Sequence, residues 1–585
     1  MPVSLLEAES LVAVDVGAVS TRALLFDVVE GEYRFIASGH AQSTAEAPRK
    51  DVSEGVRNAI ANLANVTGRT LLDQARNPIL PTTLEGSGFD AMVVTLSAGP
   101  ALRTVLLGLL SDVSLESARR LAESAYSRIS DTLGLDDHRR PEKLIDNLIR
   151  IQPDLVLIAG GTEGGASRSV QKMIEPVGLA SFLMPREKRP VVLYAGNQKM
   201  ESEVQTLLGS LAASLHFSPN IRPSLETEDL EPAARELARL SIDIRKNQIK
   251  GVDLLDSWSK GHILPTGYAL GRIMRFLSQV YAGTKGILCV DVGASAAILS
   301  AGFKDKATLA VYPQFGLGEN ISSLLNYTTA EEILRWSPLE ASASALRDLL
   351  HQKSLYPATI PATREDEALT QAVSRQALSL AARMAMRDFP RTATRLRPGL
   401  LPLFDPILAC GSALSDITRP GDSLLLLLDA LQPVGVTTVI LDQNDLLPLL
   451  GAAAAQNPLV PVQVLESGAF LSAGTIVSPV VSAGIGTSIL RARLQYGNQT
   501  EARVEVKFGS IETLPLASGE SGRLYLQPLH GADVGFGAGR AGTIPVSGGA
   551  LGVVFDGRGR PIHLPADAAR RRELIKRWHM ALGGA

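Results

Sequence analysis

The chain carries one pattern twice, as Leu11-Val-Ala-Val-Asp15-Val-Gly17-Ala-Val-Ser20-Thr21 and as Ile287-Leu-Cys-Val-Asp291-Val-Gly293-Ala-Ser295. In each copy an apolar run predicts a buried strand, and the acidic residue stands where that strand leaves the core. The glycine that follows lets the backbone turn sharply and approach a ligand. A single Asp-x-Gly is most often only a turn. Two copies favour two similar lobes whose loops face each other and hold a polyphosphate.

The composition is that of a folded protein with more than one domain. Its 585 residues exceed what one hydrophobic core usually supports. Hydrophobic residues make up 45% and charged residues 20%, as in ordinary globular proteins. The net charge of −3 gives no general attraction for nucleic acid or for an anionic membrane.

The N-terminus and the apolar stretches predict a cytoplasmic protein. Residues 1–9 lack the basic start and the long apolar core of a signal peptide. The most apolar stretch, residues 424–428, is interrupted by Asp429 and cannot span a bilayer, which needs about 20 apolar residues. Cys289 and Cys410 lie in apolar runs, which predicts buried thiols in a reducing compartment.

The sequence pattern divides the chain into three segments. Residues 1–265 are predicted to form a first α/β lobe with an α/β insertion, residues 266–480 a second lobe, and residues 481–585 a β-rich domain that ends in a helix. Within the first segment a long helix is expected from Ser114 to about Ile129. Apolar strands that end in glycine and precede helical patterns predict βαβ units, and they are residues 155–158 and 191–194.

The paired loops resemble those of the actin/Hsp70/sugar-kinase superfamily, in which ATP lies between two related, ribonuclease H-like α/β lobes. The resemblance implies that the loops at Gly17 and Gly293 touch the phosphates from opposite sides through backbone N–H groups. It also implies that Asp15 and Asp291 orient a hydrated Mg²⁺ ion. The pair Gly411-Ser412 matches the third motif of the superfamily, where adenosine packs against the backbone.

More specifically, the chain resembles the accessory proteins of methylaspartate (glutamate) mutase, a family called MutL or GlmL. The resemblance runs from the first loop to about Pro479. It implies a chaperone-like accessory protein whose partner is a cobalamin-dependent mutase. The β-rich domain has no clear counterpart in that family. The resemblance rests on an ordered series: Asp15-x-Gly17…Thr21, Leu157-Ile-Ala-Gly160-Gly161-Thr162-Glu163-Gly164-Gly165, Pro265-Thr266, Asp291-x-Gly293 and Ala372–Leu380.

The resemblance also implies a set of site residues. If ATP is hydrolysed, Glu163 is the candidate that orients the attacking water, and a solvent-exposed turn residue is an equal alternative. The three residues before it could equally form a plain turn with a helix N-cap. The residues assigned to the nucleotide are Asp15, Gly17, Ser20, Thr21, Arg22, Gly160, Gly161, Thr162, Asp291, Gly293, Ala294, Ser295, Gly411 and Ser412.

Both phosphate loops depart from the family pattern. In the first loop Ala18 and Val19 replace a Ser-Thr pair, and Arg22 replaces a lysine. In the second loop Ala294 replaces a glycine, and both hydroxyl residues and the last acid are missing, although Ser295 is present. Each lost hydroxyl contact removes roughly 0.5–1.5 kcal/mol if it is buried. These departures predict weak ATP or ADP binding, with slow hydrolysis or none.

Three functions remain open from the sequence. The first is an ATP-responsive accessory protein, in which nucleotide changes the grip on a partner because it binds the open and closed states with different affinity. The second is an actin-like scaffold that forms homo-oligomers, filaments or membrane machinery. The third is a small-molecule kinase, which the lost hydroxyls disfavour. After the apolar stretch at residues 436–441, a polar cluster follows. It consists of Asp442, Asn444 and Asp445 and is best explained as the start of a helix.

Overall fold

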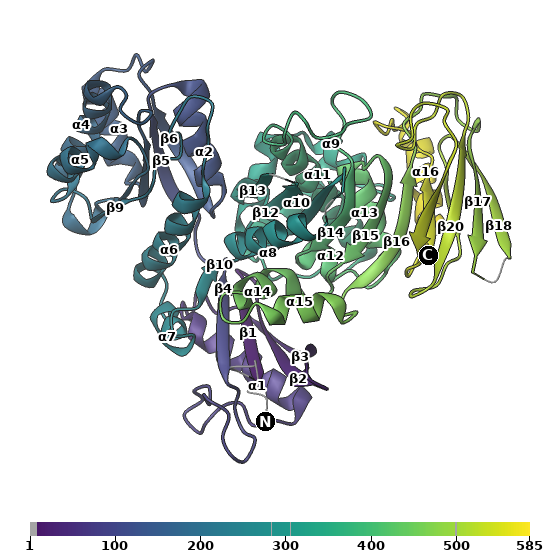
Figure 1. Ribbon diagram of the computed structural model, residues 1–585, viewed down its shortest axis with the longest axis horizontal. Coiled ribbons are helices and arrows are strands. Elements are labelled where there is room, and N and C mark those ends of the chain that lie inside the picture. The colour runs from purple at the N-terminus through teal and green to yellow at the C-terminus, as the bar shows by residue number, and fades with distance from the viewer. Residues whose placement is uncertain (1–8, 282, 305, 498–499, 585) are drawn as a thin grey trace.

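The computed structural model describes residues 9–281, 283–304, 306–497 and 500–584. Two lobes, an inserted α/β domain and a C-terminal β part make up the molecule (Figure 1). The sheet of the first lobe has the strand order β10-β4-β1-β2-β3. Its strands are β1 (Ser10–Val16), β2 (Ser20–Val29), β3 (Glu32–Gln42), β4 (Ala91–Leu96) and β10 (Ile263–Pro265).

The sheet of the second lobe repeats this arrangement. Its order is β13-β12-β11-β14-β15-β16-β22-β19, and β11, β12 and β13 are antiparallel neighbours as β1, β2 and β3 are. Strands β14 and β15 then run parallel to β11, as β4 and β10 run parallel to β1. The two-lobed, ribonuclease H-like fold class is therefore confirmed. The strands are β11 (Gly286–Val292), β12 (Ala297–Phe303), β13 (Lys306–Tyr312), β14 (Phe404–Cys410), β15 (Gly435–Leu441) and β16 (Leu471–Ser478).

Helix α1 (Val52–Thr67) covers the first sheet. Asp51 caps it by accepting a 3.0 Å hydrogen bond from the amide of Ser53. Its side chains at helical spacing, Val56, Ile60 and Leu63, are buried against the strands. Helix α7 (Val252–Trp258) also lies beside the first lobe, and α8 (Thr266–Val280) leads into the second lobe.

The insertion has its own parallel sheet, in the order β6-β5-β7-β8-β9. One helical layer, α3, α4 and α5, covers one face, and α2 and α6 cover the other. The strands are β5 (Leu102–Gly108), β6 (Ser127–Leu133), β7 (Leu155–Ala159), β8 (Val191–Tyr194) and β9 (Ser214–Phe217). The helices are α2 (Glu116–Glu123), α3 (Pro141–Ile151), α4 (Ser167–Leu183), α5 (Glu201–Leu208) and α6 (Glu231–Gln248).

The expected helix from Ser114 to Ile129 is wrong at its C-terminal end. Helix α2 ends at Glu123, and Ile129 lies in β6. Residues 127–133 pair with β5 in parallel, so sheet formation overrides the local helical pattern there. The predicted strands at residues 155–158 and 191–194 are confirmed as β7 and β8.

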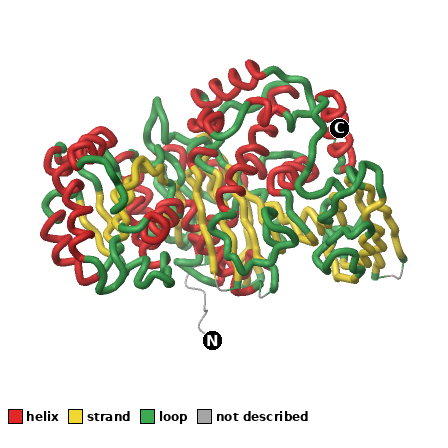
Figure 2. The backbone as a smooth tube through the Cα atoms, turned by 90° about the horizontal axis from the view of Figure 1, so that it is seen from above, coloured by secondary structure: helices red, strands yellow, loops and turns green. Residues whose placement is uncertain are grey.

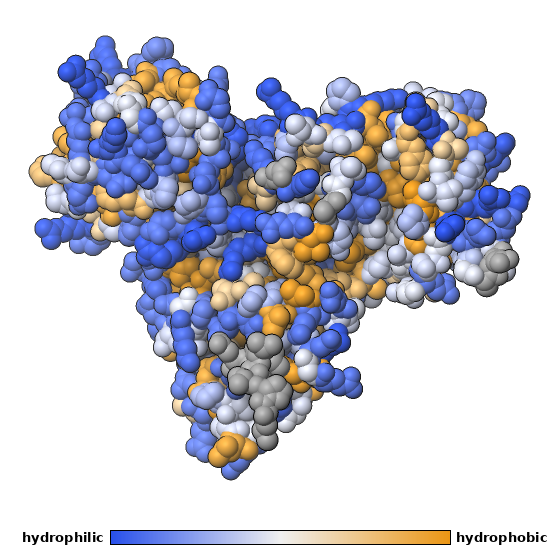
Figure 3. Space-filling model, in the orientation of Figure 1, coloured by the Kyte–Doolittle hydropathy of each residue, from blue (hydrophilic) through white to orange (hydrophobic). Residues whose placement is uncertain are grey.

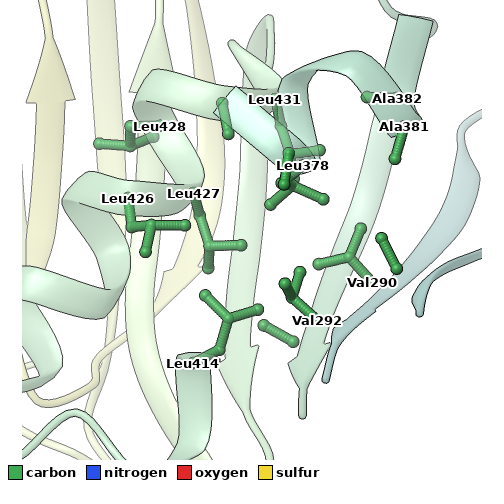
Figure 4. Close-up of a cluster of buried hydrophobic side chains, with 14 of the residues drawn as sticks. Val290, Val292, Leu378, Ala381, Ala382, Leu414, Leu426, Leu427, Leu428 and Leu431 are labelled. Carbon is green, nitrogen blue, oxygen red and sulfur yellow. The ribbon is translucent and has the colours of Figure 1, made fainter. Parts of the chain in front are cut away.

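The largest core lies in the second lobe. Val290 and Val292 of β11 face Leu378 and Ala381 of α11, and the leucines of α13 pack beside them (Figure 4). The apolar run at residues 424–428 is thus a buried helix. Within the described residues, no helix is both long and apolar enough to cross a membrane. The helices of this lobe are α9 (Ala330–Leu334), α10 (Ala343–Leu355), α11 (Arg364–Ala385), α12 (Ser412–Ser415), α13 (Pro420–Leu431), α14 (Leu446–Ala453) and α15 (Leu459–Glu466).

The C-terminal part forms a second β layer at the end of the molecule opposite to the insertion (Figures 1 and 2). Four antiparallel strands in the order β18-β17-β20-β21 pack on one face of β16 and β22. Strands β22 and β19 also follow residue 480 in sequence, but β22 pairs with β16 and β19 pairs with β22, so they extend the sheet of the second lobe. The elements are β17 (Ser488–Tyr496), β18 (Glu501–Lys507), β19 (Ile511–Leu514), β20 (Ser521–Pro528), β21 (Gly542–Ser547), β22 (Val553–Asp556) and α16 (Ala568–Ala581).

Candidate functional site

A cleft of about 720 Å³ lies between the two lobes. Both Asp-x-Gly loops line it, from the carboxyl ends of β1 and β11. The sequence-based expectation that the two loops face one space is therefore confirmed geometrically. The predicted site residues that line the cleft are Asp15, Gly17, Ser20, Arg22, Asp291, Gly293, Ala294, Ser295, Gly411 and Ser412.

The two acidic residues lie at the base of the cleft, where Asp291 is buried and Asp15 is half-buried. Asp15 accepts hydrogen bonds from the hydroxyls of Thr95, at 2.6 Å, and Thr266, at 3.1 Å. Burial raises the pKa of the Asp15 carboxyl above its ordinary value. Burial, reinforced by the negative charge of Asp15, raises the pKa of Asp291 to about 7. Two carboxyls that both resist ionisation form a site that a cation stabilises.

The glycine amides are not the free donors of the loops. The N–H of Gly17 donates to the carbonyl of Ser20 at 2.9 Å, and that of Gly293 donates to Ala296 at 3.0 Å. These bonds close two tight turns, so these two amides are already paired within their own loops. A Cβ at position 17 would lie 2.9 Å from the carbonyl oxygen of Ser20, so this turn requires glycine.

The free amides belong to the residues that follow each glycine. Within the described part of the chain, the N–H groups of Ala18, Val19, Ala294 and Ser295 donate to no acceptor, and all four residues line the cleft. Two pairs of unpaired N–H groups on facing turns form an anion-binding concavity. None of the four residues has a left-handed φ, so Ala294 fits its loop without backbone strain.

The hydroxyls of the first loop point in different directions. Ser20 lines the cleft, whereas Thr21 is fully buried and does not. The Thr21 hydroxyl lies beneath the loop, 3.1 Å from the position that a Cβ on Gly55 of α1 would occupy. The structure therefore places Thr21 in the packing between β2 and α1. In the second loop, the Ser295 hydroxyl donates to the carbonyl of Ser97 at 2.8 Å and joins the two lobes.

Arg22 spans the cleft from β2 to the second lobe. Its guanidinium forms an ion pair with Asp416 at 3.1 Å and a second one with Asp445. The arginine side chain is 6% exposed, and its charge also acts on Asp15 and Asp291, whose pKa values it lowers against the effect of burial. Arg22 is thus the cation that balances an acidic cleft, and it holds the lobes together.

The adenosine motif predicted at the end of β14 lies against the second phosphate loop. Gly411 has a left-handed φ of +86°, and a Cβ there would lie 2.2 Å from a carboxylate oxygen of Asp291. Its amide donates to Asp445 at 2.7 Å. The neighbouring Asp442 accepts the amide of Leu447 at 2.8 Å, which is the helix-start role predicted for it.

The glycine-rich segment at residues 160–163 lies elsewhere. It follows β7 in the insertion, and neither Gly160, Gly161, Thr162 nor Glu163 lines the cleft. The carboxylate of Glu163 accepts a 2.8 Å hydrogen bond from Asn220 of the same domain. The structure thus separates these four residues from the other predicted site residues, because β7 belongs to a different sheet. A role for Glu163 in orienting water finds no support in this arrangement.

Sequence reasoning missed the wall of the cleft opposite the phosphate loops. Residues 357–363, between α10 and α11, line it together with Lys353 of α10. The Lys353 ammonium donates to the carbonyl of Thr359, and burial lowers the pKa of this lysine. Asp416 and Asp445 were also missed as members of the site. No local motif marks these residues, since only the fold brings them to the cleft.

The chain is similar in sequence to a known protein family. The model of a family described as "MutL protein" matches residues 11–468. The chain belongs to this MutL family. "Protein MutL" of Clostridium tetanomorphum is 27% identical over 222 residues, which is 37% of this chain and 45% of that protein. The match thus spans less than half the length of this MutL relative. The four-stranded C-terminal sheet lies beyond the part that the MutL model matches.

Solved structures share a distant similarity with this MutL-family chain. Nucleotide-free acetone carboxylase, described as carrying out ATP-dependent acetone carboxylation, is 12% identical, with a TM-score of 0.30 over 85% of this chain and 81% of its own. The diol dehydratase-reactivating factor in nucleotide-free form is 10% identical, with a TM-score of 0.29 over 78% of this chain and 99% of its own. TM-scores this low support no inference about ligand or activity.

Proposed function

We propose that this MutL-family protein is an ATP-responsive accessory protein with weak or absent ATP hydrolysis. ATP or ADP occupies the cleft, and movement of the lobes changes the affinity for a protein partner. The observation that carries the proposal is the pair of facing loops, with four unpaired amides beside the carboxyls of Asp15 and Asp291. The proposal places the protein in the cytoplasm, where ATP is available.

The residues of the cleft fit a nucleotide with Mg²⁺. The amides of Ala18, Val19, Ala294 and Ser295 are free to donate to phosphate oxygens from both sides. Asp15 and Asp291 would hold the hydrated ion, which supplies positive charge that neutralises the phosphates. At the adenosine motif, residue 411 presents bare backbone to the cleft.

Weak turnover follows from what surrounds the phosphate loops. Glu163, the candidate that would orient water, lies in the insertion and outside the cleft. The hydroxyl of Ser295 is already bound to a carbonyl of the first lobe. Arg22 is paired with two carboxylates and must release at least one of them before it can contact phosphate. Each feature reduces transition-state stabilisation relative to a competent ATPase.

A cobalamin-dependent mutase is the proposed partner. The resemblance to methylaspartate mutase accessory proteins and the membership in the MutL family support this class of partner. Nucleotide can affect the partner only if it binds the open and closed lobes with different affinity. The ion pairs of Arg22 across the cleft provide a contact that depends on the distance between the lobes.

Calorimetric titration with Mg–ATP and Mg–ADP tests the nucleotide site. We expect saturable binding to the wild type and at least about tenfold weaker binding to Asp15→Ala, because one of the two carboxyls at the base of the cleft is lost. Asp112→Ala is the matched control, since Asp112 is exposed on the insertion and should bind like the wild type. Absence of binding to the wild type, or ATP hydrolysis at ordinary ATPase rates, would contradict the proposal.

Sedimentation with and without Mg–ATP separates the accessory function from an actin-like scaffold. An accessory protein should remain a small species of constant size and should release or bind the mutase when ATP is added. ATP-dependent filaments would favour the scaffold instead. The same sedimentation experiment with Asp15→Ala shows whether partner release or filament formation requires the cleft.

A further inference from the structure

The four-stranded C-terminal sheet has one apolar face and one charged face. Side chains alternate along each strand, so Leu490, Ala492 and Leu494 of β17 point into a core shared with the second lobe. The residues between them point outward and are exposed. The charged side chains of this outer face are Arg491, Arg493, Glu501, Arg503, Glu505, Lys507 and Arg523.

The outer face is positively charged although the whole chain is not. Five of its charged side chains are basic and two are acidic, whereas the chain carries a net charge of −3. Within the described residues, neither Arg491 nor Arg523 has an ion-pair partner. Hydrophilic residues gather over β17 and β18 at the right-hand edge of the surface (Figure 3). Local charge of this kind attracts an anionic partner.

Two of the arginines lie directly opposite each other on neighbouring strands. Arg493 of β17 is in register with Arg503 of β18, and their side chains are 50% and 71% exposed. Like charges in this position destabilise a sheet. Both arginines share Glu501, at 3.7 Å from Arg493 and within 3.0 Å of the Nε of Arg503, so one carboxylate serves two cations. One negative charge thus balances two positive charges, and both arginine side chains are exposed to solvent.

The ring of Tyr525 packs against one of these two arginines. It lies opposite Arg493 on β20, and the Arg493 guanidinium stands over its ring at 5.4 Å from the centroid. This contact positions the planar guanidinium over the ring, and its other close partner is Glu501 at 3.7 Å. Arginines presented in this way match the geometry of carboxylate groups.

We propose that this outer face docks an acidic surface of a partner protein. The excess of exposed arginine, the like-charged pair and the rigid sheet support an occupant with clustered carboxylates. A single-stranded nucleic acid fits less well, because bases need a series of aromatic platforms. The outer face carries one aromatic ring on β17, β18, β20 and β21, Tyr525, and Arg493 already covers it.

The docking face is attached to the second lobe. Its inner side packs on β16 and β22, which belong to the sheet that carries Asp291. None of the charged residues of the outer face lines the cleft. The inference does not depend on nucleotide binding, so it stands or falls separately from the proposed function.

Fluorescence anisotropy of the full chain with a labelled poly-glutamate peptide of about 20 residues tests the proposal. At about 50 mM salt we expect saturable binding that weakens at higher salt, since exposed charges are screened. The double variant Arg493→Glu/Arg503→Glu should bind roughly tenfold more weakly or not at all. Arg168→Glu/Lys172→Glu, on the exposed side of α4, is the control with the same change in charge and should bind like the wild type.

The neutral variant Arg493→Gln/Arg503→Gln tests whether the glutamate variant loses binding only because it is misfolded. It should unfold at about the same temperature as the wild type, because it removes both the like-charged pair and the contacts of these arginines with Tyr525 and Glu501, and it should still lose peptide binding. Three results would overturn the proposal: no saturable binding by the wild type, equal loss in the α4 control, or retained binding in the neutral variant. A 20-nucleotide oligo(dT) that binds more tightly than the peptide, and is lost in both sheet variants, would reassign the face to nucleic acid.

Discussion

Single residues decide the electrostatics of the cleft. Asp15 and Asp291 lie close enough for the charge of one to raise the pKa of the other. Arg22 offsets part of this repulsion and is itself divided between Asp416 and Asp445. The unpaired backbone N–H groups of the two turns add partial positive charge, but they cannot accept or release a proton during a reaction. These features support the proposed binding of a charged ligand more than its chemical transformation.

Replacing Asp291 by Asn should stabilise the protein in the absence of ligand. The folded pKa of about 7 lies above the ordinary value of 3.8, so the folded state binds more protons between these two pH values. Stability consequently falls as pH rises from about 4 to 7, and the cost is complete above 7. We expect Asp291→Asn to gain about 2–4 kcal/mol at pH 8 and almost nothing at pH 4. Thermal unfolding at both pH values measures this, and an equal effect at both would contradict it.

Replacing Asp416 by Ala should strengthen nucleotide binding. The carboxylate of Asp416 is 64% exposed and holds Arg22 at 3.1 Å, so its removal frees one side of the guanidinium and takes one negative charge from the cleft. We expect Mg–ATP to bind about three- to tenfold more tightly, the range of a partly screened ion pair. Calorimetry measures the change, with Asp112→Ala as control. Unchanged or weaker binding would show that Arg22 does not compete between carboxylate and ligand.

At the scale of elements, a buried ion network joins the C-terminal part to the second lobe. Asp429 of α13 binds Arg375 of α11 at 2.8 Å and Arg558 at 2.5 Å. Arg558 and Arg560 both bind Asp556 at the end of β22, at 2.8 and 2.7 Å. All five side chains are at most 4% exposed. The predicted boundary at residue 480 stays a prediction, and it crosses both a sheet and this network.

Asp429→Ala should destabilise the second lobe strongly. The substitution leaves two buried guanidinium groups without their shared carboxylate, which costs about 3–5 kcal/mol. Calorimetric unfolding should show a lower transition temperature for this part of the molecule. Glu332→Ala is the control, because its ion pair with Arg335 at 2.8 Å is half-exposed and contributes within about 0.5 kcal/mol. A similar small effect of both variants would contradict the prediction.

At the scale of the whole molecule, the insertion is tied to the second lobe as well as to the first. Arg119 of α2 binds Asp388, just after α11, at 2.7 Å, and Lys306 of β13 lies 4.0 Å from Glu228 of the insertion. A charged cavity of about 520 Å³ separates the two parts beside these contacts. Any opening of the lobes must therefore stretch or break this bridge.

Asp388→Ala should loosen the insertion without unfolding it. Arg119 keeps Glu116 and Glu123 as partners within α2, so the cost is confined to the contact between domains. We expect faster amide hydrogen exchange in residues 111–123 and little change in the cores of the lobes. Asp348→Ala, exposed on α10, should leave exchange unchanged. Identical exchange in both variants would mean that the bridge does not restrain the insertion.

The two lobes and the base of their cleft were predictable from local sequence. An apolar strand followed by Asp-x-Gly is a local pattern, and two copies at residues 11–21 and 287–295 sufficed to predict facing loops. The strands at 155–158 and 191–194 were also predicted, because buried strands are read from short apolar runs.

Which polar residues meet in the cleft depends on how the sheets and lobes are arranged in space. The glycine-rich segment at Glu163 has the local sequence of a phosphate loop, but β7 lies in a separate sheet and carries it away from the cleft. Asp416 and Asp445 have no motif, yet they reach Arg22 from some 400 positions away along the chain. Local sequence specifies the conformation of a segment, whereas the neighbours of a side chain depend on sheet order and on packing between lobes, which no short pattern encodes.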